Sequence, residues 1–263
     1  MPIFSKYFFR KLHNRLFLEI SHIFRKFCNI FPSSEKLTIV TGASSNHFKS
    51  LLQLLESIRK YENADIVVWD LGLTLTEKTE FLKRFPFIKY FKFDYSKYPE
   101  YFNIEIKAGE YAWKPVIIKE TYDQCTTNLL WMDAGCVIYN RLNTIRYLIR
   151  YYGFYCSLTQ GTIKEWTHKE SMDFLKLSEI DKSKPLLAAY VVGFNKKSKR
   201  VQSILSEWFN YSFVREAIAP IGSNRLNHRQ DQSLLSILYY KHYKKVPSLC
   251  RYLHDIKAQR DIG

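Results

Sequence analysis

The sequence predicts an α/β fold, in which helices cover both faces of a mostly parallel central sheet. Three short apolar runs, Leu37–Thr41, Ala64–Asp70 and Ile88–Phe93, have the length of buried strands. The stretches between them carry apolar residues at helical spacing. A chain that alternates strands and helices in this way builds a parallel sheet through right-handed crossovers. We therefore expect one main domain in the 263 residues.

The first predicted strand leads into a turn of small residues, Gly42–Asn46. A helix follows, with Leu51, Leu55 and Ile58 on one face. Ligands of doubly wound sheets gather beyond the carboxyl ends of the strands, so this turn is a candidate ligand contact. It matches neither the dinucleotide fingerprint nor a P-loop.

Two of the later strands have an acidic residue at their carboxyl end. The second strand ends on Asp70, and a helix separates it from the third. Residues 97–114 show no regular pattern, and Pro115 then suits the first turn of a helix. That helix leads into the apolar strand Asn128–Met132, which Asp133 follows directly.

The second half of the chain continues the alternation with longer helices. The expected strands are Gly153–Thr159 and Leu187–Phe194, and the expected helices are Leu142–Tyr152, Lys169–Leu177, Ser198–Asn210 and Asp231–Tyr243. No internal repeat or low-complexity tract interrupts them.

Residues 1–34 are predicted to form a separate basic amphipathic helix, with the main domain over residues 35–263. Apolar residues recur at spacings of three or four, at Phe4, Phe8, Leu12, Leu16, Ile20, Ile23, Phe27 and Ile30. Six basic residues accompany them against one acid, Glu19. Such a helix suits an anionic membrane surface. The open alternative is a helix that packs on the domain and leaves its basic groups in solvent.

The composition narrows the class of ligand and the compartment. The net charge of +15 favours anionic partners: phosphate-bearing ligands, anionic lipid or nucleic acid. No nucleic-acid motif accompanies it, so nucleic acid is not expected. The five cysteines are scattered without a metal-binding spacing, which favours a reducing compartment. No apolar run is long enough to predict a membrane span. We expect a cytoplasmic protein, peripheral on the inner face of a membrane.

The candidate chemistry lies at the ends of two predicted strands. Asp133 follows a buried strand and precedes two small residues, so a ligand can approach its carboxylate closely. A carboxylate there can hold a divalent cation against a diphosphate. Asp70 either shapes the same pocket or is only a turn acid. Lys114, between Trp113 and Pro115, either meets phosphate or is solvated on a surface turn.

Three motifs together resemble the GT-A glycosyltransferases, and in particular a little-characterised bacterial-type group of that superfamily. They are Val67–Leu73, the Tyr-x-Trp-Lys-Pro motif at Tyr111–Pro115, and the Trp-x-Asp-Ala-Gly motif at Trp131–Gly135. The resemblance covers roughly residues 36–245. It implies a nucleotide-diphospho-sugar donor, with Mn²⁺ or Mg²⁺ usually held by an Asp-x-Asp motif. This chain departs from that pattern, because Asp133–Ala134–Gly135 has one acid.

The resemblance also implies roles for individual residues. The donor-binding residues it suggests are Thr41, Gly42, Ala43, Asp70, Trp113, Lys114, Ala134 and Gly135. A metal would be held by Asp133 with His254, or with its neighbour Asp255. Asp231 is the candidate base that deprotonates the acceptor. The acceptor side would be lined by Gln160, Gly193, Asn195 and Arg229.

The leading hypothesis is a hexosyltransferase-type enzyme that moves a sugar from a UDP-sugar to a cell-surface glycan or glycolipid, such as lipopolysaccharide or capsule. The alternative is a non-catalytic protein that binds nucleic acid or membrane on a degenerate glycosyltransferase scaffold. A nucleotidyltransferase is disfavoured, since Ala43–Asn46 is not the glycine-rich basic loop that it needs.

Overall fold

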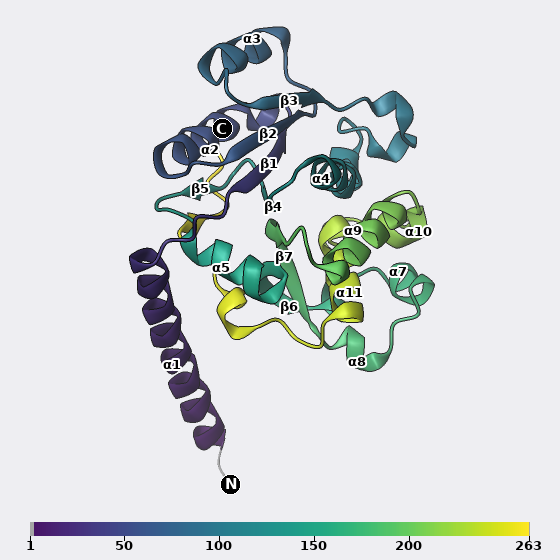
Figure 1. The fold of residues 1–263 in the computed structure, drawn as a ribbon. Coiled ribbons are helices and arrows are strands. Elements are labelled where there is room, and N and C mark those ends of the chain that lie inside the picture. The colour runs from purple at the N-terminus through teal and green to yellow at the C-terminus, as the bar shows by residue number, and fades with distance from the viewer. Residues whose placement is uncertain (1–2, 263) are drawn as a thin grey trace.

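The computed structural model describes the backbone of residues 3–262 and the side chains of residues 17–262. A six-stranded sheet runs through the domain in the order β3-β2-β1-β4-β7-β6 (Figure 1). Its strands are β1 (Leu37–Ala43), β2 (Asp65–Asp70), β3 (Lys89–Lys92), β4 (Asn128–Met132), β6 (Phe154–Thr162) and β7 (Pro185–Phe194). A small second sheet pairs β5 (Val137–Ile138) with β8 (Ile256–Lys257).

The first half of the sheet is the parallel αβ unit that the sequence predicts. Strands β3, β2, β1 and β4 are parallel neighbours, connected by α2 (Phe48–Tyr61), α3 (Leu75–Arg84) and α4 (Trp113–Gln124). Every residue of β1 is buried, as expected for a strand covered on both faces. Helix α3 begins with a capping box between Thr74 and Glu77, which fixes its start.

The second half adds two strands and a layer of longer helices. Strand β7 runs antiparallel to both β4 and β6, so it is the one reversed strand of the central sheet. The longer helices are α5 (Asn143–Tyr152), α9 (Lys199–Ser212) and α11 (Gln230–His242). The short helices are α6 (Ile163–Trp166), α7 (Lys169–Phe174), α8 (Glu179–Lys182) and α10 (Arg215–Ile218). Figure 1 labels α7, α8 and α10. A mostly parallel sheet with helices around it is confirmed.

The segment that lacks a sequence pattern contains an unusual left-handed turn. Residues Lys107–Tyr111 all have a positive φ, between 45° and 62°. L-residues rarely adopt this conformation in succession, because the Cβ approaches the following carbonyl. Gly109 is required here, since a Cβ on it would lie 2.3 Å from the carbonyl oxygen of Phe102. The turn leads directly into α4 and so sets the position of that helix's first residues.

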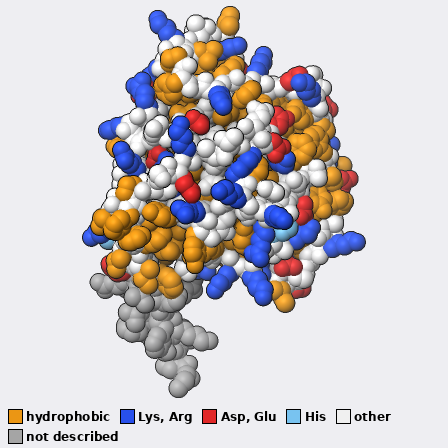
Figure 2. Space-filling view, viewed as in Figure 1, with side chains coloured by type: hydrophobic (Ala, Val, Ile, Leu, Met, Phe, Trp, Pro, Cys, Tyr) orange, Lys and Arg blue, Asp and Glu red, His pale blue; other side chains and the backbone are white. Residues whose placement is uncertain are grey.

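Helix α1 (Ile3–Ile30) extends away from the sheet, and only its end meets the domain (Figure 1). Ser21 and Cys28 are buried against the domain. In contrast, Ile23, Phe27 and Ile30 of the predicted apolar stripe are 64%, 50% and 70% exposed. The part of the apolar stripe whose side chains the structure describes is therefore exposed. Figure 2 shows apolar side chains gathered on this part of the surface, beside the end of α1.

The length of α1 raises the question of a membrane span. Within residues 3–262, no helix is both long and apolar enough to cross a membrane. The N-terminal helix itself agrees with the sequence pattern, and the domain boundary at residues 34–35 falls between the end of α1 and the start of β1. That boundary remains a prediction.

Candidate active site

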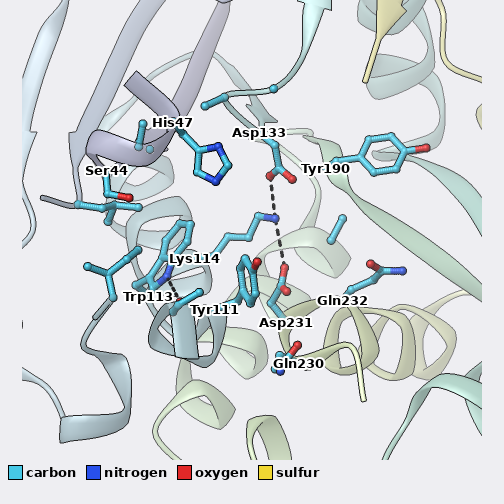
Figure 3. Close-up of a pocket in the computed structure, with 18 of the residues that line it drawn as sticks. Ser44, His47, Tyr111, Trp113, Lys114, Asp133, Tyr190, Gln230, Asp231 and Gln232 are labelled. Atoms are coloured by element: carbon cyan, nitrogen blue, oxygen red, sulfur yellow. Dashed lines mark hydrogen bonds and ion pairs between the residues drawn. The ribbon is translucent and has the colours of Figure 1, made fainter. Parts of the chain in front are cut away.

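A cavity of about 570 Å³ opens at the carboxyl ends of β1 and β4 (Figure 3). Its walls come from segments that are far apart in the sequence. The polar and charged residues that line it are Ser44, Asn46, His47, Tyr111, Lys114, Asp133, Tyr190, Arg225, Arg229, Gln230, Asp231, Gln232, Gln259 and Asp261. The strand order places β1 between β2 and β4, so the cavity lies in the middle of the sheet edge, where ligands of open α/β sheets bind.

Lys114 lies at the centre of the charged groups. It belongs to the first turn of α4, and only 4% of it is exposed. Its Nζ lies 2.9 Å from Asp133 Oδ1 and 3.3 Å from Asp231 Oδ2, so it joins the two acids (Figure 3). Burial alone would lower the pKa of Lys114, but the two carboxylates outweigh burial and raise it. Lys114 is therefore a buried cation held between two carboxyl groups.

Asp133 is the partly exposed acid of this group. Its side chain is 42% exposed, and Oδ1 accepts a hydrogen bond of 2.7 Å from Trp131 Nε1 in addition to the contact with Lys114. Its backbone N–H donates to the carbonyl of Tyr190 on β7 at 2.9 Å. Strand β4 and these contacts fix the carboxylate, and its remaining surface faces the cavity.

Asp231 is the buried acid, in the first turn of α11 and 5% exposed. Burial raises the pKa of the Asp231 carboxyl above its ordinary value; Lys114 opposes the rise and Asp133 adds to it. A carboxyl whose pKa moves upward in a cavity is a candidate general base, because it accepts a proton more readily than a solvated one. Asp231 lines the cavity, and its role as the base stays a prediction.

A buried hydrogen bond connects the two walls that carry Lys114 and Asp231. Gln230, with a φ of 35°, donates from Nε2 to Glu110 Oε2 at 3.0 Å. Glu110 is itself part of the left-handed turn before α4. Glu110 and Gln230 thus both have a positive φ, a strained conformation for residues other than glycine. Such strain persists only where the surrounding contacts hold it, and it is found most often at functional sites.

The cavity unites most of the residues expected to bind the donor. The donor-binding candidates that line it are Gly42, Ala43, Trp113, Lys114, Ala134 and Gly135. Asp133 and Asp231, predicted as catalytic residues, and Arg229, predicted on the acceptor side, line it as well. The turn after β1 and the turn after β4 therefore meet in space, as the resemblance implied. The contributions of Tyr190, Arg225, Gln259 and Asp261 were not anticipated, because each lies in a segment without a recognisable motif.

Two expected acceptor residues lie at the wrong edge of the sheet. Gly193 pairs with Leu130 at the far end of β7, and a Cβ on it would lie 2.5 Å from Ile149. Asn195 donates to the carbonyl of Ile149. The prediction for Gly193 and Asn195 is wrong because β7 is antiparallel, so its carboxyl end lies opposite the cavity. Residues from the middle of β7, Ala189 and Tyr190, line the cavity instead.

Three further residues that were predicted to bind donor or acceptor do not line the cavity. Gln160, near the end of β6, is exposed, and Thr41 is buried within β1. Asp70 accepts hydrogen bonds from the backbone N–H groups of Gly72 and Leu73, which identifies it as the turn acid. It supports the turn that carries Leu71 into the cavity wall.

The expected metal pair of Asp133 with His254 is not brought together. His254 is buried outside the cavity lining, and its Nε2 lies 2.8 Å from the carbonyl oxygen of Leu249. Its neighbour Asp255 is paired with Arg25. Among the described side chains, no three His, Cys, Asp or Glu residues are grouped so as to hold a metal ion. The donor set around Asp133 therefore does not fit the expected metal site.

Comparisons with known proteins agree with this fold. The family described as a protein of unknown function, DUF1647, matches residues 4–119. A search of the curated proteins found no match. The apo structure of the bifunctional glycosyltransferase WbbM is similar with a TM-score of 0.50 and 15% identity, over 82% of this chain and 39% of that one. An active-site mutant of LgtC is similar with a TM-score of 0.50 and 15% identity, over 77% of this chain and 70% of that one.

These likenesses define the class of fold. The chain shares the mixed α/β fold of glycosyltransferase structures, with a six-stranded, mostly parallel central sheet. It spans 39% of the length of WbbM, so the activities of that larger protein are not transferred with the fold.

Proposed function

We propose that the protein is a glycosyltransferase that binds a nucleotide-diphospho-sugar, with UDP-sugar as the first candidate, in the cavity between β1 and β4. The observation that carries this proposal is Lys114, a buried cation placed between Asp133 and Asp231 at 2.9 and 3.3 Å. The nucleotide would lie along the Gly42–Ala43 turn, and the sugar would face the two acids. The fold, which glycosyltransferase structures share, supports the assignment.

The charges of the cavity suggest how each side chain acts. Lys114, Arg225 and Arg229 supply three cations, and Asp133, Asp231 and Asp261 supply three anions. Preorganised cations stabilise a diphosphate leaving group as its negative charge develops. Asp231 would take the proton from the acceptor hydroxyl, and Asp133 would hold Lys114 in position. A glycan or glycolipid acceptor enters from the open side of the cavity.

The substitution Asp133→Asn tests this proposal. It keeps the shape of the side chain and removes the charge that faces Lys114. We expect sugar transfer and donor hydrolysis to fall by about 10²–10³-fold, measured by release of UDP. The matched control is Asp123→Asn, an exposed acid on α4 that pairs with Lys119. A non-catalytic binding protein would release no UDP above background in either form.

We further propose that α1 places the enzyme on an anionic membrane surface, where a lipid-linked acceptor resides. The exposed stripe of Ile23, Phe27 and Ile30 supplies the apolar face. Helix α1 carries six basic residues against one acid by sequence, which complements anionic lipid.

The double substitution Ile23→Gln and Phe27→Gln should remove membrane binding. Each apolar side chain contributes about 1.5–3 kcal/mol when buried, so recovery with vesicles containing phosphatidylglycerol should fall at least about ten-fold. Leu75→Gln, a change of a 79% exposed side chain on α3, is the control. Substitution is cleaner than deletion of residues 1–31, which would also remove the buried Cys28. Unchanged recovery of the double variant would contradict this proposal.

A further inference from the structure

The segment of residues 256–262, here called the strap, closes one side of the cavity. Its first residues form β8, which pairs with β5. The N–H of Arg260 then donates to the carbonyl of Gly135 at 2.8 Å, and the N–H of Ile262 donates to Ser50 Oγ at 2.8 Å. The strap is therefore attached along its length to the turn after β4 and to α2. Gln259 and Asp261 of the strap line the cavity.

Asp261 occupies the space beside Gly135 that a side chain at residue 135 would fill. A Cβ on Gly135 would lie 2.5 and 2.6 Å from the two carboxylate oxygens of Asp261 and 2.7 Å from its Cγ. The usual Asp-x-Asp motif has a second acid where this chain has Gly135. The carboxylate of Asp261, from the strap, lies beside that position in the folded chain. Asp261 Oδ1 also lies 3.1 Å from Nδ1 of His47, which directly precedes α2. A carboxylate in this place can accept hydrogen bonds from the hydroxyl groups of a sugar donor.

The strap begins at a buried charge that α1 neutralises. Asp255 is fully buried and has a φ of 62°, and its carbonyl accepts a hydrogen bond of 3.0 Å from the N–H of Tyr139. Arg25 Nη2 of α1 lies 2.5 Å from Asp255 Oδ1. Among the described side chains, Arg25 is the one basic residue paired with this carboxylate. A buried carboxylate that loses its cation is strongly destabilised, so the start of the strap depends on α1.

We propose that Arg25 is a positioning residue of the donor site. Through Asp255 it fixes the strap, and the strap presents Asp261 beside Gly135. The N-terminal helix is then part of the site's construction in addition to any contact with a membrane. The identity of the ligand rests on the proposed function, whereas the anchoring of the strap does not.

Arg25→Met tests the anchoring, with hydrogen–deuterium exchange of residues 256–262 as the first readout. We expect exchange in the strap to rise about ten-fold or more while exchange in β1 and β4 stays at the wild-type rate. Lys26→Met, the loss of the same charge at the next residue of α1, should leave the strap unchanged. Arg25→Lys keeps the charge and should restore most of the protection.

The second readout is the affinity for a UDP-sugar, whose sugar hydroxyl groups Asp261 would contact, measured by calorimetry. Release of the strap should raise the Kd several-fold at unchanged stoichiometry, whereas loss of folded protein would lower the stoichiometry at unchanged Kd. If Arg25→Met does not fold, the double substitution Arg25→Met with Asp255→Asn removes the buried carboxylate together with its partly exposed partner and is measured instead.

The outcomes separate the two proposals. Strap exchange within about two-fold of wild type in a folded variant would overturn the anchoring. A released strap with unchanged Kd would overturn its role in the donor site. A wild-type protein that binds no UDP-type ligand would contradict the proposed function, and the exchange result would still decide whether Arg25 anchors the strap.

Discussion

Replacement of Lys114 by Met is expected to abolish transfer and to destabilise the fold. The substitution leaves Asp231 buried next to Asp133 without its cation. Breaking a buried ion pair by removing one partner costs about 3–5 kcal/mol, which is a large part of the stability of a single domain. Activity should fall by at least about 10³-fold, because the cation that faces the leaving group is also lost. Chemical denaturation and UDP release measure the two effects.

Two further variants separate the charge effect from lost packing. The double substitution Lys114→Met with Asp231→Asn removes both buried charges, so it should recover much of the stability without recovering activity. Lys119→Met, one turn later on α4, breaks the surface pair with Asp123 and should cost less than about 1 kcal/mol. Equal losses for Lys114→Met and Lys119→Met would show that the buried triad has no special role.

The second large effect is expected at Asp231. Asp231→Asn should lower kcat by about 10²–10⁴-fold, the usual contribution of a general base. Stability should change little or increase, because Lys114 keeps its closer partner Asp133 at 2.9 Å and burial disfavours the charge that the substitution removes. Opposite responses of activity and stability would distinguish this residue from a purely structural acid.

The pH dependence of kcat/KM provides an independent readout for the same residue. Burial raises the pKa of Asp231, so its basic form is lost as the pH falls through this raised value. The acid limb of the wild-type profile should therefore lie above about 3.9, the ordinary value for aspartate. The residual activity of Asp231→Asn should lack this limb. An unchanged limb in the variant would assign it to another group.

The parallel half of the fold and most of the donor turn could be predicted from local patterns. Buried strands, small-residue turns and Pro115 at a helix start are encoded within a few residues of one another. Parallel strands also bring their carboxyl ends to one edge, so the meeting of Gly42 and Asp133 follows from the topology. Both residues line the cavity.

Gly193 and Asn195 were misplaced because strand direction is not encoded locally. The apolar run of β7 is compatible with either direction, and the antiparallel one moves Gly193 and Asn195 to the opposite edge. The expected pairing of Asp133 with His254 was misplaced for a related reason: the residues after Leu253 lack a periodic pattern, so nothing indicated that Asp255 pairs with Arg25 of α1. Only the packed chain shows that Asp261, and not His254, reaches the Asp133–Gly135 turn.

A thermal-shift titration of the full chain with nucleotide-diphospho-sugars, with and without Mn²⁺, tests the central claim most directly. The cavity has three cationic and three anionic side chains, so it has no surplus positive charge for a donor with two negative charges. Titrations with and without Mn²⁺ therefore show whether the donor needs a further cation. At a ligand concentration 100 times Kd, binding stabilises the native state by about 2.7 kcal/mol. We predict a raised Tm with one class of nucleotide-diphospho-sugar, UDP-sugars first, and a loss of that shift in Lys114→Met. An unchanged Tm across all donor classes, with and without Mn²⁺, would contradict the account.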